Sequence, residues 1–175
     1  MKIIAFAGSN SKNSINKKLA TYVSHLFDGS EVEVLDLNDY ALPVFGVDLE
    51  KEIGQPQLAK DFLDKIALAD ILVVSLAENN GNYSTAFKNI FDWTSRQTKE
   101  VFQQKNMLLM ATSPGGRGGA TVLEIAATAF PRFGAIVKNT FSLPSFNDNF
   151  DIQNNRISNS ELDLQIREIV RNFNS

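Results

Sequence analysis

The fold is decided by one stretch near the start of the chain, IIAFAGSNSKNSIN at residues 3–16. Residues 3–7 form a continuous apolar run, the pattern of a strand that is buried on both faces of a parallel sheet. Gly8 ends this run, and over residues 15–27 apolar side chains recur at helical spacing, with Ser14 placed to cap the helix. Strand, loop and helix in this order predict an α/β fold.

The same alternation continues along the chain. Further strands are predicted at residues 31–37, 70–76, 106–112 and 135–141, and further helices at residues 56–68, 84–96, 117–133 and 158–173. Five strands alternating with five helices favour a doubly wound parallel sheet of order 2-1-3-4-5, with helices on both faces. Residues 38–55 and 142–157 lack a regular pattern and are predicted to be loops, the second long enough to cover a site.

Length and composition limit the class of protein. The chain has 175 residues, of which 43% are hydrophobic, so we expect a single domain over residues 1–175. A net charge of -3 gives no field that would recruit nucleic acid. Because the chain has no cysteine, any redox role requires a bound cofactor. The first apolar run is far shorter than the roughly 20 residues of a membrane span, so we expect a cytoplasmic protein without a membrane partner.

The loop after the first strand has the composition of an anion site. It runs directly into a predicted helix N-terminus, where unpaired N–H groups and the helix dipole favour a phosphate. Its predicted phosphate donors are Ser9, Ser11, Ser14 and Asn16, with a screened charge from Lys12. Capping and turn formation are the alternative, and they account for at least one of these residues. A single glycine in this loop disfavours a Rossmann dinucleotide site.

Two further loops are predicted at the same edge of the sheet. They are AENNGNYS at residues 77–84 and SPGGRGG at residues 113–119. Glycines let the backbone approach a flat ring closely. Taken alone, the glycine run is equally consistent with a flexible turn before the next helix. Together with the first loop, it predicts a slot for a planar ligand.

Three segments together resemble the NAD(P)H-dependent FMN reductase family, flavodoxin-like enzymes that include quinone, chromate and azo-dye reductases. They are residues 8–16, residues 77–96 with the string KNIFDWTSR, and residues 113–119. The resemblance implies a flavodoxin-like FMN-binding domain with NAD(P)H as electron donor. It places the FMN phosphate on Ser9, Ser11, Ser14, Ile15 and Asn16, and the isoalloxazine between Glu78, Asn79, Asn80 and Gly81 on one side and Ser113, Gly116 and Arg117 on the other.

The sequence departs from the family pattern at three places, one of which is the usual Ser-x-Pro-Gly, replaced here by NYST at residues 82–85. The usual Pro-Glu-Tyr-Asn is replaced by AENN at residues 77–80, so the tyrosine near the flavin is absent, although Tyr83 follows four positions later. The usual arginine of the phosphate loop is Lys12. Without the paired hydrogen bonds that an arginine makes to phosphate, and without the aromatic contact of the tyrosine, FMN binding is expected to be weaker or the face that meets the substrate to be altered.

The resemblance also implies a reaction. Electrons pass from NAD(P)H through FMN to a quinone, free flavin or another small oxidant. No general acid or base is assigned, and Arg117 is a candidate contact for the nicotinamide phosphate or the acceptor, with a solvated loop arginine as the alternative. A flavodoxin-like electron carrier and a non-catalytic flavin-binding protein remain open, as do the acceptor and the choice between NADH and NADPH.

The resemblance also implies a homodimer or homotetramer that pairs through the helices that follow the third and fourth strands. Phe87, Phe91 and Trp93 lie on the first of these helices, but their helical spacing is equally typical of core residues.

Overall fold

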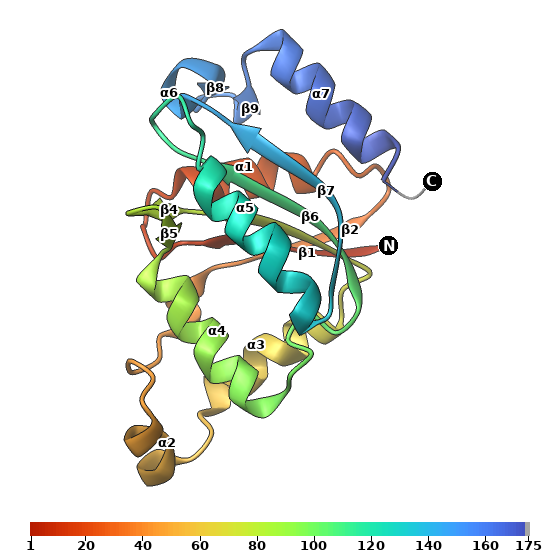
Figure 1. Cartoon of the computed structure of the whole chain (residues 1–175). Helices are drawn as coiled ribbons and strands as arrows, with labels where there is room; N and C mark the ends of the chain where they lie inside the picture. Colours follow the sequence, from red (N-terminus) through yellow and green to blue (C-terminus); the bar gives the residue numbers. More distant parts are fainter. Residues whose placement is uncertain (174–175) are drawn as a thin grey trace.

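The computed structural model describes residues 1–173 and is built on a five-stranded parallel sheet (Figure 1). The strands in spatial order are β2 (Glu31–Leu35), β1 (Lys2–Gly8), β3 (Ile71–Leu76), β6 (Lys105–Thr112) and β7 (Ala135–Leu143). All neighbouring pairs are parallel, so the predicted order 2-1-3-4-5 is confirmed. The central strands β1 and β3 are buried on both faces, in keeping with their continuous apolar sequence.

Helices cover both faces of the sheet (Figure 1). The helices α1 (Ile15–Ser24) and α7 (Ser160–Arg171) pack on the face that carries Ile3 and Ala5. The other face, which carries Ile4 and Phe6, is covered by α3 (Gln57–Ala67), α4 (Thr85–Gln97) and α5 (Ala120–Ala129). Alternate side chains of each strand therefore supply two separate hydrophobic cores. None of the described helices is both long enough and apolar enough to cross a bilayer.

Residues 38–55 are not the irregular loop that the sequence predicts. They include most of a 3-10 turn, η1 (Leu37–Tyr40), and a separate helix, α2 (Val47–Ile53). Since α2 buries none of its residues, it lacks the amphipathic pattern by which a helix is recognised in a sequence. Figure 1 shows α2 projecting from the body of the molecule beyond α4.

The prediction of a long loop at residues 142–157 is also wrong. This segment contains α6 (Phe146–Asn149) and a hairpin of β8 (Phe150–Asp151) and β9 (Arg156–Ile157). Phe146 and Phe150 stack with ring centroids 4.7 Å apart and are both buried. The segment is thus fixed to the core beside α1 and α7, and its N–H groups at Ser145 and Phe146 donate to the carbonyls of Gly115 and Ser113 at 3.0 Å, so it packs against the loop at residues 113–119.

Some predicted boundaries shift as well. The helix predicted at residues 117–133 begins at Ala120 and gives way to a 3-10 turn, η2 (Phe130–Phe133). The loop at residues 77–84 contains a short hairpin of β4 (Glu78–Asn79) and β5 (Asn82–Tyr83). These changes leave the carboxyl ends of β1, β3 and β6 adjacent, because Gly8 lies opposite Leu76 and Leu76 lies opposite Ala111.

Candidate functional site

The three loops after β1, β3 and β6 enclose a cleft of about 260 Å³. Eight predicted site residues line it: Ser9, Ser11, Ser14, Ile15, Asn16, Glu78, Asn79 and Ser113. The predicted residues Asn80, Gly81, Gly116 and Arg117 lie outside its lining. Four lining residues, Asn13, Ala77, Thr112 and Pro114, are absent from the predicted set. The loops therefore converge on one cleft, as the planar-ligand hypothesis requires.

The N-terminus of α1 gives this cleft an anion-binding end. Ser14 caps the helix, since its Oγ accepts from the Lys17 N–H at 3.1 Å and its carbonyl accepts from the Lys18 N–H at 3.2 Å. Within residues 1–173, the N–H groups of Ile15 and Asn16 have no hydrogen-bond partner. Two free donors at the positive end of a helix dipole form a binding site for phosphate.

The side chain of Asn16 forms hydrogen bonds to other parts of the protein. Its Nδ2 donates to the Thr112 carbonyl at 3.1 Å, and its Oδ1 accepts from the Thr112 N–H at 3.0 Å and from the Ser75 Oγ at 2.7 Å. All three residues are buried. The side chain thus joins the first loop to β3 and to the end of β6, a role that the sequence analysis missed. Contact between Asn16 and a phosphate stays a prediction, and the backbone N–H is the free group that would make it.

Glu78 ties the second loop to α5. Its Oε2 accepts from the Val122 N–H at 3.0 Å. The N-cap residue of α5 is Gly119, which has no side chain to cap the helix. A carboxylate from 44 residues away therefore takes the place of a local cap and also interacts favourably with the helix dipole. No local sequence signal reveals this contact, because the two residues belong to different elements.

The glycines of the third loop divide into two kinds. Gly118 and Gly119 have φ of +59° and +74°, and a Cβ added to them would lie 2.3 Å from the Ser142 Oγ and 2.9 Å from the Ala111 Cβ. Packing and backbone conformation thus require glycine there. At Gly115 and Gly116, an added Cβ would meet nothing closer than 3.9 Å. The protein's own packing does not require glycine at these two positions, which leaves an open cradle beside the cleft.

The Asn80-Gly81 pair has a structural reason of its own. Both residues have positive φ, 51° and 73°, as a two-residue type I′ hairpin turn between β4 and β5 demands. Tyr83 does not take the place of the missing tyrosine. Its ring packs on Phe87 and Phe130 at centroid distances of 5.4 and 6.0 Å, outside the lining of the cleft. Its hydroxyl is buried without a partner among the described residues, and burial raises its pKa to about 12.

Arg117 is exposed, and its Nη2 donates to the Thr121 Oγ1 in the first turn of α5 at 3.0 Å. Its predicted contact with a nicotinamide stays a prediction. Phe87, Phe91 and Trp93 are all buried, which confirms that they are core residues of α4. They are therefore not available for contact between subunits.

A family model described as NADPH-dependent FMN reductase matches residues 1–148. The chain belongs to this family. It is accordingly an oxidoreductase that uses FMN and NAD(P)H, as the resemblance in its sequence implies. The part of the chain that matches contains all three loops of the cleft.

Curated relatives of this FMN reductase family member include two bacterial proteins. The MG342 homolog of Mycoplasma pneumoniae is 30% identical over 150 residues, which cover 83% of this chain and 88% of that protein. A quinone reductase of Escherichia coli K12 is 29% identical over 121 residues. That alignment covers 69% of this chain and only 64% of the E. coli protein.

Solved structures show the same fold. The flavoenzyme FerB of Paracoccus denitrificans, an NAD(P)H:(acceptor) oxidoreductase, has a TM-score of 0.76 at 22% identity, with 98% of this chain and 94% of FerB covered. The apo form of the NADH:FMN oxidoreductase EMOB has a TM-score of 0.66 at 18% identity, with 98% of this chain and 87% of EMOB covered. At these identities the likeness concerns the flavodoxin-like fold alone.

The donor set of the cleft fits the family's cofactor. The free N–H groups of Ile15 and Asn16 suit a phosphate, and the open positions at Gly115 and Gly116 leave room for a flat ring beside the second loop. Each loop is also fixed by contacts within the protein, through Asn16, Glu78 and Ser142, whose Oγ donates to the Gly118 carbonyl at 3.0 Å. The cleft is thus preorganised for a ligand.

Proposed function

We propose that this FMN reductase family member transfers electrons from NAD(P)H to a quinone, with FMN held in the cleft between the three loops. The observation that carries the proposal is the pair of free N–H groups, of Ile15 and Asn16, at the α1 end of a cleft that is also lined by side-chain amides and has Gly115 and Gly116 beside it. When bound, FMN supplies a two-electron relay. NAD(P)H gives up a hydride, and the quinone takes two electrons and two protons, one of them from solvent, to become a hydroquinone.

The protein's part in this reaction is binding and orientation. In the proposal, the phosphate lies on Ser9, Ser11, Ser14 and the N–H groups of Ile15 and Asn16. The ring lies between residues 78–81 and the third loop, at Ser113, Gly116 and Arg117. Backbone N–H groups of these loops would stabilise negative charge on the reduced ring, so no acid or base side chain is assigned.

The names of two relatives support a quinone as the electron acceptor, and the net charge of the chain bears on the electron-carrier alternative. The E. coli relative is named quinone reductase, and a relative from Mesomycoplasma hyopneumoniae, 30% identical over 110 residues, is named FMN-dependent NADH:quinone oxidoreductase. The second alignment covers 54% of this chain and 55% of that protein. A net charge of only -3 argues against a flavodoxin-like electron carrier.

A visible absorption spectrum of the purified protein, followed by an assay of NADH or NADPH oxidation, tests the proposal. Purified protein is expected to be yellow, or to become so on addition of FMN, and to oxidise NADH or NADPH steadily when a quinone is present. Protein that takes up no FMN contradicts the cofactor assignment. Bound FMN without nicotinamide oxidation favours the electron carrier instead, and FMN binding without turnover on any acceptor favours a non-catalytic flavin-binding protein.

We further propose a homodimer that pairs through α4 and α5. On α5 the outward residues Thr121, Ile125 and Thr128 are uncharged and lie beside a single exposed carboxylate, Glu124. Light scattering coupled to size exclusion, on the parent and on a Thr128→Arg variant, tests this pairing. A monomeric parent protein contradicts it. The cytoplasmic location stays a prediction from the sequence.

A further inference from the structure

A second cavity of about 410 Å³ adjoins the cleft. It lies between Asn10 at the tip of the first loop, the segment at residues 37–44, and the first turn of α4. Asn79 lines both this cavity and the cleft, so the two share a wall. The volume is in the range of natural small-molecule sites. None of the residues predicted from the sequence to bind FMN, other than Asn79, lines this cavity.

The lining of this second cavity carries no charge. It combines an apolar wall, which includes Leu37, Tyr40, Leu42 and Val44, with the side-chain amides of asparagines. No lysine or arginine is present in this lining to pair with the two phosphates of a dinucleotide. A neutral ring with a few polar atoms at its edge fits such a lining.

The first turn of α4 adds hydrogen-bond donors. Ser84 caps this helix, with its Oγ accepting from the Phe87 N–H at 3.1 Å and its carbonyl accepting from the Lys88 N–H at 2.9 Å. Within the described chain, the N–H groups of Thr85 and Ala86 have no partner, and both residues line the cavity. Donors at a positive helix end favour carbonyl oxygens and stabilise negative charge that develops on them. These requirements are those of a quinone that is being reduced.

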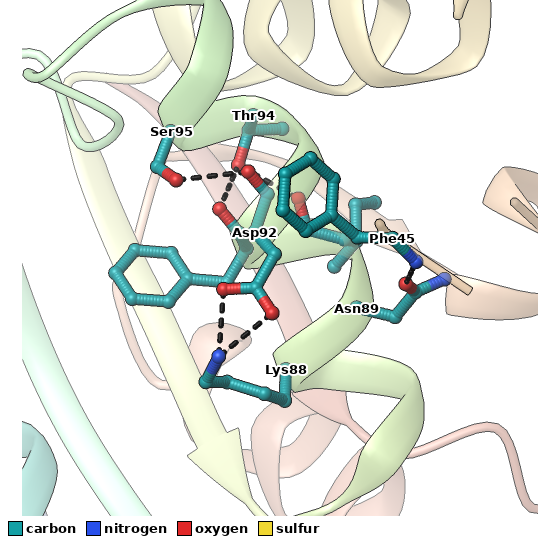
Figure 2. A network of polar contacts seen from close by, with 8 residues as sticks. Phe45, Lys88, Asn89, Asp92, Thr94 and Ser95 are labelled. Carbon is teal, nitrogen blue, oxygen red and sulfur yellow. Dashed lines mark hydrogen bonds and ion pairs between the residues drawn. The ribbon is translucent and has the colours of Figure 1, made fainter. Parts of the chain in front are cut away.

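The wall opposite α4 is held in place by the helix itself. Asn89 donates from Nδ2 to the carbonyls of Leu42 and Pro43 at 3.0 and 3.1 Å, and its Oδ1 accepts from the Phe45 N–H at 2.8 Å. Figure 2 shows the last of these bonds beside the Lys88–Asp92 pair of the same helix. Trp93 adds a bond from Nε1 to the Pro43 carbonyl at 2.8 Å. The asparagine and tryptophan of the string KNIFDWTSR thus fix the segment that carries Leu42 and Val44.

We propose that this second cavity binds the oxidising substrate, a neutral quinone, next to the FMN cleft and across Asn79. The inference rests on the proposed function and adds to it the site that selects the acceptor. In the reaction, the quinone gains two electrons that NAD(P)H supplies, together with two protons, so that both of its carbonyl oxygens become hydroxyls. Trp93 is a positioning residue, because it does not line the cavity and acts on the quinone only through the wall that it holds, whereas Asn89 both holds this wall and lines the cavity.

A matched pair of variants on the same segment tests the site. Val44→Trp fills the cavity from a residue that is 75% exposed, so the fold tolerates the larger side chain. Val47→Trp makes the same change at a residue that is 57% exposed and does not line the cavity. The measured quantity is the ratio of kcat/KM with 1,4-naphthoquinone to kcat/KM with ferricyanide. We expect this ratio to fall about tenfold or more in Val44→Trp and to keep its parent value in Val47→Trp.

A binding measurement makes the test independent of turnover. Saturation-transfer NMR of 1,4-naphthoquinone with FMN-free protein is expected to give a signal for the parent and for Val47→Trp, and a much weaker one for Val44→Trp. Equal signals and equal acceptor ratios in the two variants overturn the proposal, as does a rise in the KM for NADH in Val44→Trp without a change in the ratio. If the parent protein binds no FMN, the proposed function fails, while the NMR comparison still decides whether the cavity takes a quinone.

Discussion

Replacement of Asn16 by alanine separates a scaffold role of this residue from a direct contact with the phosphate. The side chain is 3% exposed, and its hydrogen-bond partners Ser75 and Thr112 are 0% and 1% exposed. Asn16→Ala removes three hydrogen bonds and leaves a hydroxyl, an N–H and a carbonyl without their partner. At about 1 kcal/mol for each bond, the free energy of unfolding of FMN-free protein is expected to fall by about 3 kcal/mol.

The matched control is Asn13→Ala, which deletes the same amide from an exposed residue of the same loop that also lines the cleft. This variant is expected to change the free energy of unfolding by less than about 0.5 kcal/mol. Urea unfolding of FMN-free protein, followed by circular dichroism, measures both values. A Ser75→Ala variant and its combination with Asn16→Ala complete a double-mutant cycle. The cycle should show a coupling of about 1 kcal/mol, because the two side chains share one hydrogen bond.

The opposite pattern would refute this reasoning. If Asn16→Ala unfolds at the same urea concentration as the parent protein, yet binds FMN much more weakly, the side chain acts on the ligand and not on the scaffold. Zero coupling between Asn16 and Ser75 would contradict the hydrogen bond on which the estimate depends.

Four further outcomes follow from the same contacts. Glu78→Ala should lower the stability of FMN-free protein by about 1 kcal/mol through loss of the α5 cap, and Glu78→Gln by less, as measured by urea unfolding. Gly116→Ala should leave that stability within about 0.5 kcal/mol and weaken FMN binding in a fluorescence titration, whereas Gly118→Ala should destabilise the protein itself by more than about 1 kcal/mol. Tyr83→Phe should leave stability at pH 7 equal or higher, because the lost hydroxyl has no partner among the described residues. Burial raises the pKa of Tyr22 and of Tyr83 from 10.0 to about 12, so the folded state keeps protons that the unfolded chain releases, and urea midpoints should fall as the pH rises from 10 towards 12.

Local signals in the sequence predict the sheet and the capped start of α1 well. The apolar runs of β1 and β3 occur only where both faces of a strand are buried, and Ser14 precedes the first helical turn that it caps. Each of these features depends on residues that are close together in the chain. The strand order then follows from the alternation of elements and the handedness of their connections.

Features that depend on distant residues are not predictable in this way. Asn16 has the same sequence context whether it binds a phosphate or Thr112, which lies 96 positions away. The helix α2 is missed because it buries no side chain, so no periodic pattern distinguishes it from a loop. The Asn80-Gly81 turn is a different case, since its signal is present in the sequence. The strands that it joins are only two residues long, too short for an alternating pattern to show.

Three contacts that fix the loops would allow this cleft to hold FMN, as proposed, without the arginine and the tyrosine of the family pattern. Asn16, Glu78 and Ser142 bind partners 96, 44 and 24 positions away, and none of these bonds needs a ligand. A site that is fixed before the ligand arrives loses little conformational entropy on binding, so fewer direct contacts suffice for a given affinity. Loosening one of these contacts should therefore weaken FMN binding even where no group that touches the cofactor has been changed. Ser142→Ala is the sharpest case, because Ser142 does not line the cleft and is not among the proposed cofactor contacts, while the bond that it loses, to the Gly118 carbonyl, fixes the third loop.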